Sequence, residues 1–520
     1  MNSWAPLRQP VFRMLWLAVL AGNVGTWMQT VGAQWRVVHE PDAATWVSLV
    51  QAATTAPVLL LALPAGTLAD GLDRRRLLLG VQLGLFAVAA GLAVLTHLDL
   101  VGPPLLLLFT FLLGAGQALT LPSWQALIPE IVPRDQLAGA SALGAVNTNL
   151  ARAAGPAAGG LIVAQAGPAA VFALNAVSFA VFALVLARWR RVAPPPPRRP
   201  ERFGPALHDG THYVRYSGDV RRILGRVLLF VLPGSVIWSL LPLVARQGLG
   251  MGADGYGILL AALGAGAVAG ALLMPRVREL LSPDRLIIGT GAVYTTALVV
   301  IALVPRVAAV VAVLAAAGLA WMMLVSRMNA AMQLVLPNWV RARALAVYQV
   351  VFAGSQAVGA LVWGQVASAF GLRATFLAAA SLMVTGLLLV RVWPVQPRED
   401  RDTDPAVFWP EPHLLTQPGL DQGPVLVQVT YRVTAEDAAA FTAALLELRE
   451  SRLRTGATRW GIFRDPADAE VIAEAYLVPT WEEHLRQHEG RLTGSDEAAE
   501  ERVRALAAGP PVISHLLGIP

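Results

Sequence analysis

Two arginines stand inside long apolar stretches of this sequence, where an ionisable side chain is costly and needs a reason. Arg152 lies in the apolar stretch 137–164 and Arg327 in the stretch 307–335. A guanidinium carries five fixed N–H donors and no acceptor, so its chemistry is the binding of carboxylates and other oxyanions. Arg152 precedes Gly155 by three residues and therefore lies near a small-residue helix face. Arg327 either joins the same interior or extends its head to an aqueous boundary.

Side-chain amides accompany these arginines and offer both donors and acceptors to a polar ligand. No Asp or Glu lies clearly inside an apolar stretch; the nearest are Glu40 and Asp42, at one end. A cationic ligand would call for a buried carboxylate, so this set favours an anionic or catechol-like, hydrogen-bonding molecule. The same lack of acids leaves His39, Glu40, Asp42 and Asp70 as the candidates for carrying a proton. The ligand-binding candidates are Asn23, Gln29, Gln34, Gln117, Asn149, Arg152, Arg327, Gln349 and Gln356.

A short, highly charged loop separates the second apolar stretch from the third. Acids and arginines this close together can form ion pairs and cap helix ends. If the apolar stretches form two helix bundles that move against each other, the loop could act as a gate between them. The alternative is a simple anchor on the cytoplasmic side of a membrane. A weaker copy, without an acid matching Asp70, recurs at 270–285. The candidate gating residues are Gly66, Asp70, Asp73, Arg74, Arg75 and Arg76.

A small-residue motif follows Arg152. Gly155 and Gly159 lie one helical turn apart, so a neighbouring helix can approach closely, and Pro156 bends the helix. With Gly160 they form the motif. The second half carries a matching small face at Gly264, Gly266, Ala269 and Gly270. Generic small-residue packing is the alternative, since the chain is rich in Gly and Ala.

The elements that position these residues are membrane-spanning helices. Of the 520 residues, 56% are hydrophobic and 14% are charged, which is typical of a polytopic membrane protein and not of a soluble one. A span needs about 20 mostly apolar residues. The sequence predicts twelve, six on each side of an arginine- and proline-rich connector expected to be flexible: 13–38, 46–68, 77–97, 103–127, 137–164, 168–187, 223–247, 255–275, 285–304, 307–335, 343–368 and 372–393.

Arginine placement predicts the orientation. The loops that face the N-terminal side carry most of the arginines, which puts both termini in the cytoplasm of a bacterial inner membrane. Residues 129–138 resemble 337–346, and 167–172 resemble 371–376, so the two groups of six spans are parallel repeats. Parallel repeats place the substrate path at the midplane between the halves.

Residues 398–520 form a soluble module with a net charge of −9, whereas residues 1–397 carry +15. Alternation predicts strands at 425–433, 458–464, 470–478 and 512–517, with helices at about 434–454 and 480–507, the second interrupted near Gly494. The order βαββαβ is ferredoxin-like. His484 and His488 share one helix face, but with His515 too remote in sequence to assign, no third metal ligand is evident. We expect packing or solvated histidines, no metal and no cofactor.

These motifs together resemble a major facilitator superfamily transporter over residues 10–395. Residues 29–35, the loop 70–76 and the appended tail resemble the enterobactin-exporter-like branch, known as transmembrane secretion effectors. The segment 155–160 resembles the antiporter motif of proton-driven drug exporters, and the tail resembles antibiotic-biosynthesis-monooxygenase-type domains. The resemblance implies the major facilitator fold, efflux by alternating access and no catalytic residues.

The sequence therefore predicts five regions: bundles at 1–190 and 223–396, linkers at 191–222 and 397–423, and the tail at 424–520. The expected function is proton-driven export of a small organic molecule such as a siderophore, an antibiotic or a drug. Uptake of a nutrient anion and a membrane-tethered monooxygenase are the alternatives. ATP hydrolysis is excluded because the chain has no lysine for a phosphate loop, and cysteine chemistry because it has no cysteine. The expected partners are the substrate, the lipid bilayer and a second copy bound through the tail, with no nucleic acid.

Overall fold

The computed structural model describes residues 4–71, 73–189, 203–337, 339–392, 406 and 418–519, without the side chains of 62–71, 126, 134, 203–209, 342, 390–392 and 489. These residues form two compact units. The first unit comprises Met1–Pro200, Gly225–Met328 and Gln349–Pro394. The second comprises Glu201–Leu224, Asn329–Tyr348 and Val395–Pro520.

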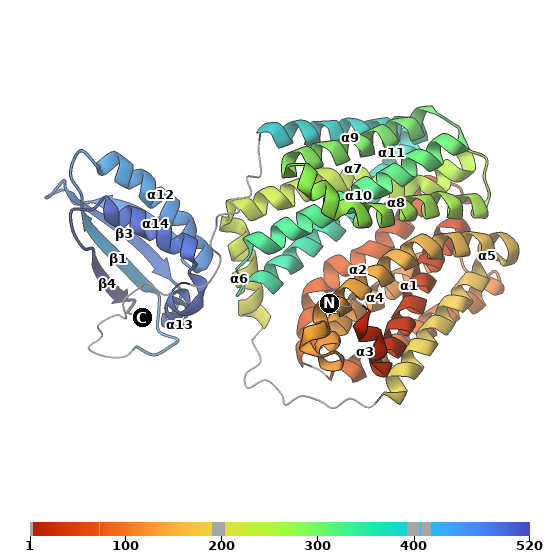
Figure 1. Ribbon diagram of the computed structural model, residues 1–520, viewed down its shortest axis with the longest axis horizontal. Helices are drawn as coiled ribbons and strands as arrows, with labels where there is room; N and C mark the ends of the chain where they lie inside the picture. The colour runs from red at the N-terminus through yellow and green to blue at the C-terminus, as the bar shows by residue number, and fades with distance from the viewer. Residues whose placement is uncertain are drawn as a thin grey trace. The chain divides into compact units, whose positions relative to one another are not determined.

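The first unit is a bundle of long apolar helices (Figure 1). Ten helices of the described chain are long and apolar enough to cross a membrane. The first half contains α1 (Pro10–Arg36), α2 (Ala43–Gly71), α3 (Arg74–His97), α4 (Pro103–Ile131) and α5 (Leu137–Arg188). The second half contains α7 (Gly218–Leu243), α8 (Ala253–Leu280), α9 (Pro283–Leu303), α10 (Val307–Val335) and α11 (Arg341–Val392).

Two helices are too long for one crossing. Helices α5 and α11 have 52 residues each, which at about 1.5 Å per residue is more than twice the roughly 30 Å of a hydrocarbon core. Each breaks at a glycine with positive φ, 77° at Gly167 and 78° at Gly371, where a Cβ would be strained. Both glycines stand where the sequence predicts a connection between two spans, and they occupy equivalent places in the two halves.

The connector between the halves contains a helix, α6 (Phe203–Tyr216), so the expectation of a wholly flexible linker is wrong. Its apolar residues Phe203, Leu207, Tyr213 and Val214 recur at helical spacing, and α6 packs against the tail helix α12. Tyr213 is buried and its ring meets that of Trp339 edge to face at 5.7 Å.

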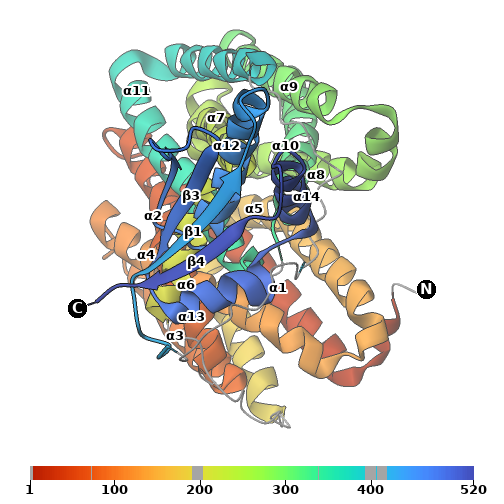
Figure 2. The same ribbon diagram turned by 90° about the vertical axis from the view of Figure 1, so that its left-hand side faces the viewer.

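The tail has the predicted order of strands and helices. Strands β1 (Val425–Arg432), β2 (Arg459–Arg464), β3 (Val471–Val478) and β4 (Val512–Leu517) pair antiparallel in the order β2-β3-β1-β4. Figure 2 shows β3, β1 and β4 side by side. Helices α12 (Ala438–Thr455), α13 (Trp481–Arg486) and α14 (Gly494–Ala505) supply the other elements. The break between α13 and α14 falls at Leu492 and Thr493, close to its predicted place.

The alternation of β1 explains the core of the tail. Val425, Val427, Val429 and Tyr431 are fully buried and pack with α12 residues such as Phe441. The intervening residues of β1 are only half-buried. One face of the sheet therefore carries the helices, and the other lacks a comparable cover among the described residues.

Candidate functional site

The charged loop lies at the start of α3. Asp73 is the N-cap of α3, where its carboxylate accepts a hydrogen bond from the backbone N–H of Arg76 at 2.8 Å. Gly66 and Asp70 fall in the last turns of α2, and their side chains lie outside the described residues. An ion pair from Asp70 to the other half therefore stays a prediction.

The loop arginines hold the first half together. Arg74 pairs with Glu130 at the end of α4, with 2.8 Å between Nη1 and Oε1. Arg75 donates to the carbonyl oxygens of Leu186 and Ala187, at 2.8 and 2.7 Å, and so satisfies the open C-terminal end of α5. These contacts join α3 to α4 and α5 within one bundle.

The weaker copy of the loop makes a comparable link. Arg226 of α7 is 8% exposed and lies 3.4 Å from Asp284 in the first turn of α9. The acid therefore comes from the Pro283-Asp284-Arg285 segment and not from a match to Asp70. Each half thus ties its third span to a neighbouring helix by an arginine–carboxylate pair.

The small-residue motif lies in a seam between the two halves. A Cβ on Gly160 would stand 2.6 Å from the Ala253 carbonyl oxygen of α8, and one on Gly257 would stand 2.8 Å from that of Pro156. Gly155 and Gly159 face α1 instead, against Trp27 and Met28. The motif therefore packs α5 between α1 and α8 at backbone contact, which larger residues would prevent.

The predicted small face of α8 is partly wrong. Gly264 does face α5, where its Cβ would stand 2.6 Å from the Arg152 carbonyl oxygen. Gly266 and Gly270 face Ala315 and Leu319 of α10. They lie two and six residues after Gly264, and these spacings place them on a different side of the helix. Gly257, at the start of the second turn of α8, completes the seam.

The predicted amides of α1 are used by the protein itself. Asn23 donates to Asn147 of α5 at 2.8 Å, and Gln29 accepts from Asn175 at 2.7 Å. Gln34 is 1% exposed and donates to Gln51 at 3.1 Å and to the Trp238 carbonyl oxygen at 3.2 Å, while Tyr256 donates to it. Gln34 thus fastens the first half to the second where α1 ends.

The remaining amides divide into two groups. Gln117 donates to Thr26 at 3.1 Å, and Asn149 donates to the Ala145 carbonyl oxygen of its own helix at 2.9 Å. Within the described chain, neither Gln349 nor Gln356 of α11 has a side-chain hydrogen bond, and neither is fully buried. Those two amides are available to a ligand in this conformation.

The two arginines differ from one another. The guanidinium carbon of Arg152 lies 5.7 Å from the ring centre of Trp27, and no described group accepts from its buried Nε. Arg327 is 8% exposed, so it is enclosed by protein and does not extend to an aqueous boundary. Enclosure keeps Arg327 among the ligand-binding candidates, which remain predictions.

Aromatic rings extend from Arg152 across the junction of the halves. Trp27 of α1 meets Trp238 of α7 at 5.9 Å between ring centres, Trp238 meets Trp321 of α10 at 5.8 Å, and Trp321 meets Phe352 of α11 at 6.2 Å. We call Arg152 with these four rings the aromatic–arginine cluster. Together they offer a cation and π faces on both sides of the junction.

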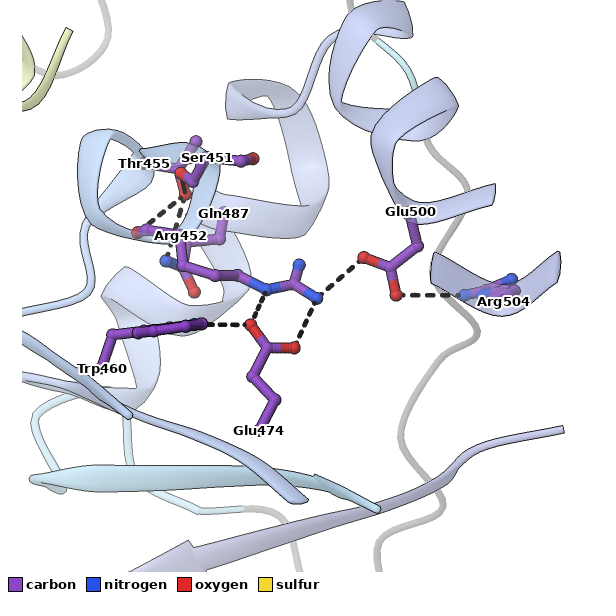
Figure 3. A network of polar contacts seen from close by, with 8 residues as sticks. All are labelled: Ser451, Arg452, Thr455, Trp460, Glu474, Gln487, Glu500 and Arg504. Atoms are coloured by element: carbon purple, nitrogen blue, oxygen red, sulfur yellow. Dashed lines mark hydrogen bonds and ion pairs between the residues drawn. The ribbon is translucent and has the colours of Figure 1, made fainter. Parts of the chain in front are cut away.

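The tail holds a second polar arrangement. Arg452 of α12 lies between two buried carboxylates, with Nε 3.1 Å from Glu474 and Nη2 2.8 Å from Glu500 (Figure 3). Trp460 donates to Glu474 at 2.8 Å. The three charged side chains are at most 3% exposed, so each depends on the others for its charge.

Three histidines cluster beside this network, so setting His515 aside as too remote was wrong. The ring of His484 lies 4.6 Å from that of His488, four residues further along the chain. The ring of His515 lies 4.8 Å from that of His484, and His515 belongs to β4, which pairs with β1. Among the described residues, no group of three His, Cys, Asp or Glu is arranged to hold a metal ion. Burial, followed by the neighbouring histidine in each case, lowers the pKa values of His484 and His488 to about 3.

The comparison with protein families decides what this assembly is. The protein-family model that is described as transmembrane secretion effector matches residues 1–519 of this chain. The chain belongs to the transmembrane secretion effector family. This family is part of the major facilitator superfamily, so the chain is a multi-pass membrane transporter and not an enzyme.

Curated relatives of this secretion effector are also transporters. The chain is 28% identical over 417 residues to the multidrug efflux pump Tap of Mycobacterium bovis, covering 74% of this chain and 94% of that protein. It is 26% identical over 255 residues to the staphyloferrin A transporter of Staphylococcus aureus, covering 49% of this chain and 64% of that one.

A solved structure supports the fold of the secretion effector. A bacterial homologue of the human lysosomal transporter Spinster, in an inward-facing and unoccupied conformation, gives a TM-score of 0.57 at 14% identity. The match covers 74% of this chain and 95% of that one. Arg152 was among the predicted residues, but its grouping with four aromatic rings was missed from sequence. Its signal was the presence of Trp27, Trp238 and Trp321 well inside apolar stretches.

Proposed function

We propose that this transporter exports a small organic anion with an aromatic, catechol-like body, such as a siderophore or antibiotic, by alternating access. The observation that carries the proposal is the aromatic–arginine cluster. Arg152 offers positive charge beside Trp27, and Trp27 meets Trp238 of the other half. A ligand held there contacts both moving bodies, which transport by rocking bundles requires.

The chemistry of the cluster selects the sign of the ligand. Arg152 supplies N–H donors that match an oxyanion, and the tryptophan faces suit a flat apolar body. The sequence has no Asp or Glu clearly inside an apolar stretch to attract a cation. Gln349 and Gln356 add donors and acceptors for hydroxyl groups. An anionic catechol meets all of these groups.

Export is favoured over uptake by the names of the relatives and by the motif. Tap is named as an efflux pump, and the 155–160 segment that resembles the antiporter motif lies in the seam between the halves. The staphyloferrin A transporter supports a siderophore-like cargo, and its matched region is about half of this chain. We also propose that the chain belongs to the enterobactin-exporter-like branch, because residues 29–35, the loop 70–76 and the tail resemble that branch.

The topology that fits this function has twelve spans in two parallel six-span repeats. Counting α5 and α11 as two spans each, divided at Gly167 and Gly371, turns ten helices into twelve. The arginine distribution places both termini on the cytoplasmic side of a bacterial inner membrane, with bundles at 1–190 and 223–396. The joined ends of the halves, at Gln34 and Tyr256, then face outward, as expected for an inward-facing state.

Proton antiport is the proposed source of energy. His39, Glu40 and Arg36 lie next to the outward end, where Arg36 and Glu40 are 3.7 Å apart and Arg246 donates to the Val38 carbonyl oxygen across the halves. Burial and then Arg246 lower the pKa of His39. A proton taken up by this group would add positive charge to the joint and favour its opening.

The tail is proposed to have a ferredoxin-like arrangement and to join two copies of the chain. The sheet order β2-β3-β1-β4 is the one that a ferredoxin-like fold has. The sheet face opposite the helices exposes Phe463 by 59%, Val512 by 66% and Leu516 by 53%. Two such faces together would bury this apolar surface. Cysteines placed at Ser514 in a chain free of other cysteines should cross-link between copies; the absence of cross-linking would contradict the dimer.

Everted membrane vesicles test the transport proposal. With an acid interior, vesicles that contain the protein should accumulate 2,3-dihydroxybenzoate, and an uncoupler should abolish the accumulation. Accumulation only in right-side-out vesicles would indicate uptake. Accumulation of the cationic dye ethidium without 2,3-dihydroxybenzoate would contradict the assignment of an anionic cargo.

A further inference from the structure

A cavity of about 370 Å³ lies within the second unit, whereas the aromatic–arginine cluster belongs to the first. Three elements supply its walls: the last turn of α6, the first turn of α7 and the C-terminal half of α12. Its volume falls in the range of about 300–1,000 Å³ that is usual for small-molecule sites. The lining residues are Arg215, Tyr216, Arg221, Arg449, Glu450 and Leu453.

The cavity carries an excess of positive charge. Arg215, Arg221 and Arg449 face a single carboxylate, that of Glu450. Among the described residues, none of these three arginines has an ion-pair partner. Arg215 lies over the Tyr216 ring at 5.7 Å and Arg449 over the Trp460 ring at 6.0 Å, contacts that leave the N–H donors open. Three open guanidinium groups around one cavity suit an oxyanion.

The other walls define the rest of the ligand. Leu453 is buried and Tyr216 is half-buried, so they offer an apolar wall. Glu450 is exposed and can accept a hydrogen bond from a hydroxyl group. The three arginines are exposed, and they come from three separate helices around one cavity. The matching ligand has an oxyanionic head on a small apolar or aromatic body.

We propose that this cavity is an anion-binding effector site that joins α12 of the tail to the first turn of α7, the helix that begins the second bundle. Only Ser217 separates Tyr216 from α7, the first helix of that bundle. The Ser217 N–H donates to the Tyr213 carbonyl oxygen and that of Arg221 to the Ser217 carbonyl oxygen, so α6 and α7 are continuous in hydrogen bonding. An anion bound by Arg221 and Arg449 ties α12 to the base of α7. The site does not depend on the proposed cargo.

Hydrogen exchange in the full chain tests the site. The protein is placed in nanodiscs of phosphatidylcholine, and exchange is followed in peptides from α6, the start of α7 and α12. Phenyl phosphate is the probe for a free organic anion and inorganic phosphate for a bare one. Nanodiscs that contain phosphatidylglycerol present the same chemistry as a lipid headgroup. Protection of both α6 and α12 by any of these sources supports the site, and the source that protects identifies the ligand.

Variants connect the protection to the arginines. Arg449→Gln and Arg221→Gln should each raise, by at least about tenfold, the anion concentration that gives half-maximal protection. This is the change expected for the loss of one charge-assisted hydrogen bond. Arg464→Gln, an exposed arginine of β2 outside the cavity, should leave it unchanged. Each variant's thermal unfolding is compared with that of the unsubstituted chain. Arg449→Lys replaces any variant that unfolds at a lower temperature. Arg449→Lys should retain part of the anion binding.

Two results would overturn the proposal. The first is the absence of protection with phenyl phosphate, inorganic phosphate and phosphatidylglycerol alike. The second is equal protection in the unsubstituted chain and in Arg449→Gln. Transport of 2,3-dihydroxybenzoate is measured on the same samples. Its loss without any change in protection would concern the proposed cargo and not this site.

Discussion

Acidification should destabilise the tail through its buried histidines. His484 is fully buried, and the pKa values of His484 and His488 are lowered from an ordinary 6.5 to about 3 by burial and by neighbouring imidazoles. Between these pKa values the unfolded chain binds protons that the folded tail does not. Stability is therefore complete above about pH 6.5 and is lost as the pH falls toward 3.

The size of the effect follows from the two pKa values. At about pH 5, each histidine costs the folded tail about 2 kcal/mol relative to about pH 8, or roughly a thirtyfold larger open population. The two rings touch, so about 4 kcal/mol is the upper limit for the pair. Arg452 is positive and His515 becomes positive as the pH falls, so both add to the same effect on the neighbouring rings.

Hydrogen exchange of the β1 and β3 amides in the full chain measures this opening, after correction for intrinsic exchange rates. His484→Phe should remove about half of the pH dependence, because a phenyl ring occupies the site without titrating. His97→Phe, at the exposed last residue of α3, is the matched control and should leave the dependence unchanged. Equal protection at both pH values, or a full dependence in His484→Phe, would refute the reasoning.

Three further substitutions test other parts of the structure. Gly160→Leu should reduce transport at least tenfold at equal membrane abundance, because its side chain collides with α8, whereas Gly80→Leu on an open face of α3 should not. Arg452→Leu should destabilise the tail by about 3–5 kcal/mol in denaturant, since two buried carboxylates lose their partner. A double-mutant cycle between Arg74→Gln and Glu130→Gln should give a coupling of about 1 kcal/mol in thermal unfolding; no coupling would contradict the ion pair.

The helices and strands followed from local patterns. Apolar stretches of span length, and alternation as clean as that of Val425–Arg432, carry their own period, so they could be predicted without knowledge of their partners. The helical breaks at Gly167 and Gly371 were also visible, because a glycine interrupts two adjoining apolar stretches. Helix α6 was missed because its arginine- and proline-rich neighbours dominate the composition of that connector.

The candidate site depended on contacts that no local pattern contains. Gln34 and Gln349 look alike in sequence, yet one is bonded to three groups and the other has no bonded partner among the described residues. The proximity of Trp27 to Trp238 joins residues more than two hundred positions apart. His515 came beside His484 only through the pairing of β4 with β1. Such pairings are set by packing between elements.

The most direct test of an anionic cargo compares two nearly identical molecules in proteoliposomes. The unsubstituted protein should transport 2,3-dihydroxybenzoate with a KM at least tenfold below that of its neutral amide, 2,3-dihydroxybenzamide, because Arg152 recognises the carboxylate. Arg152→Gln should remove this preference and leave transport of the amide unchanged. A preference for the anion that survives in Arg152→Gln, or equal transport of both molecules by the unsubstituted protein, would contradict the account.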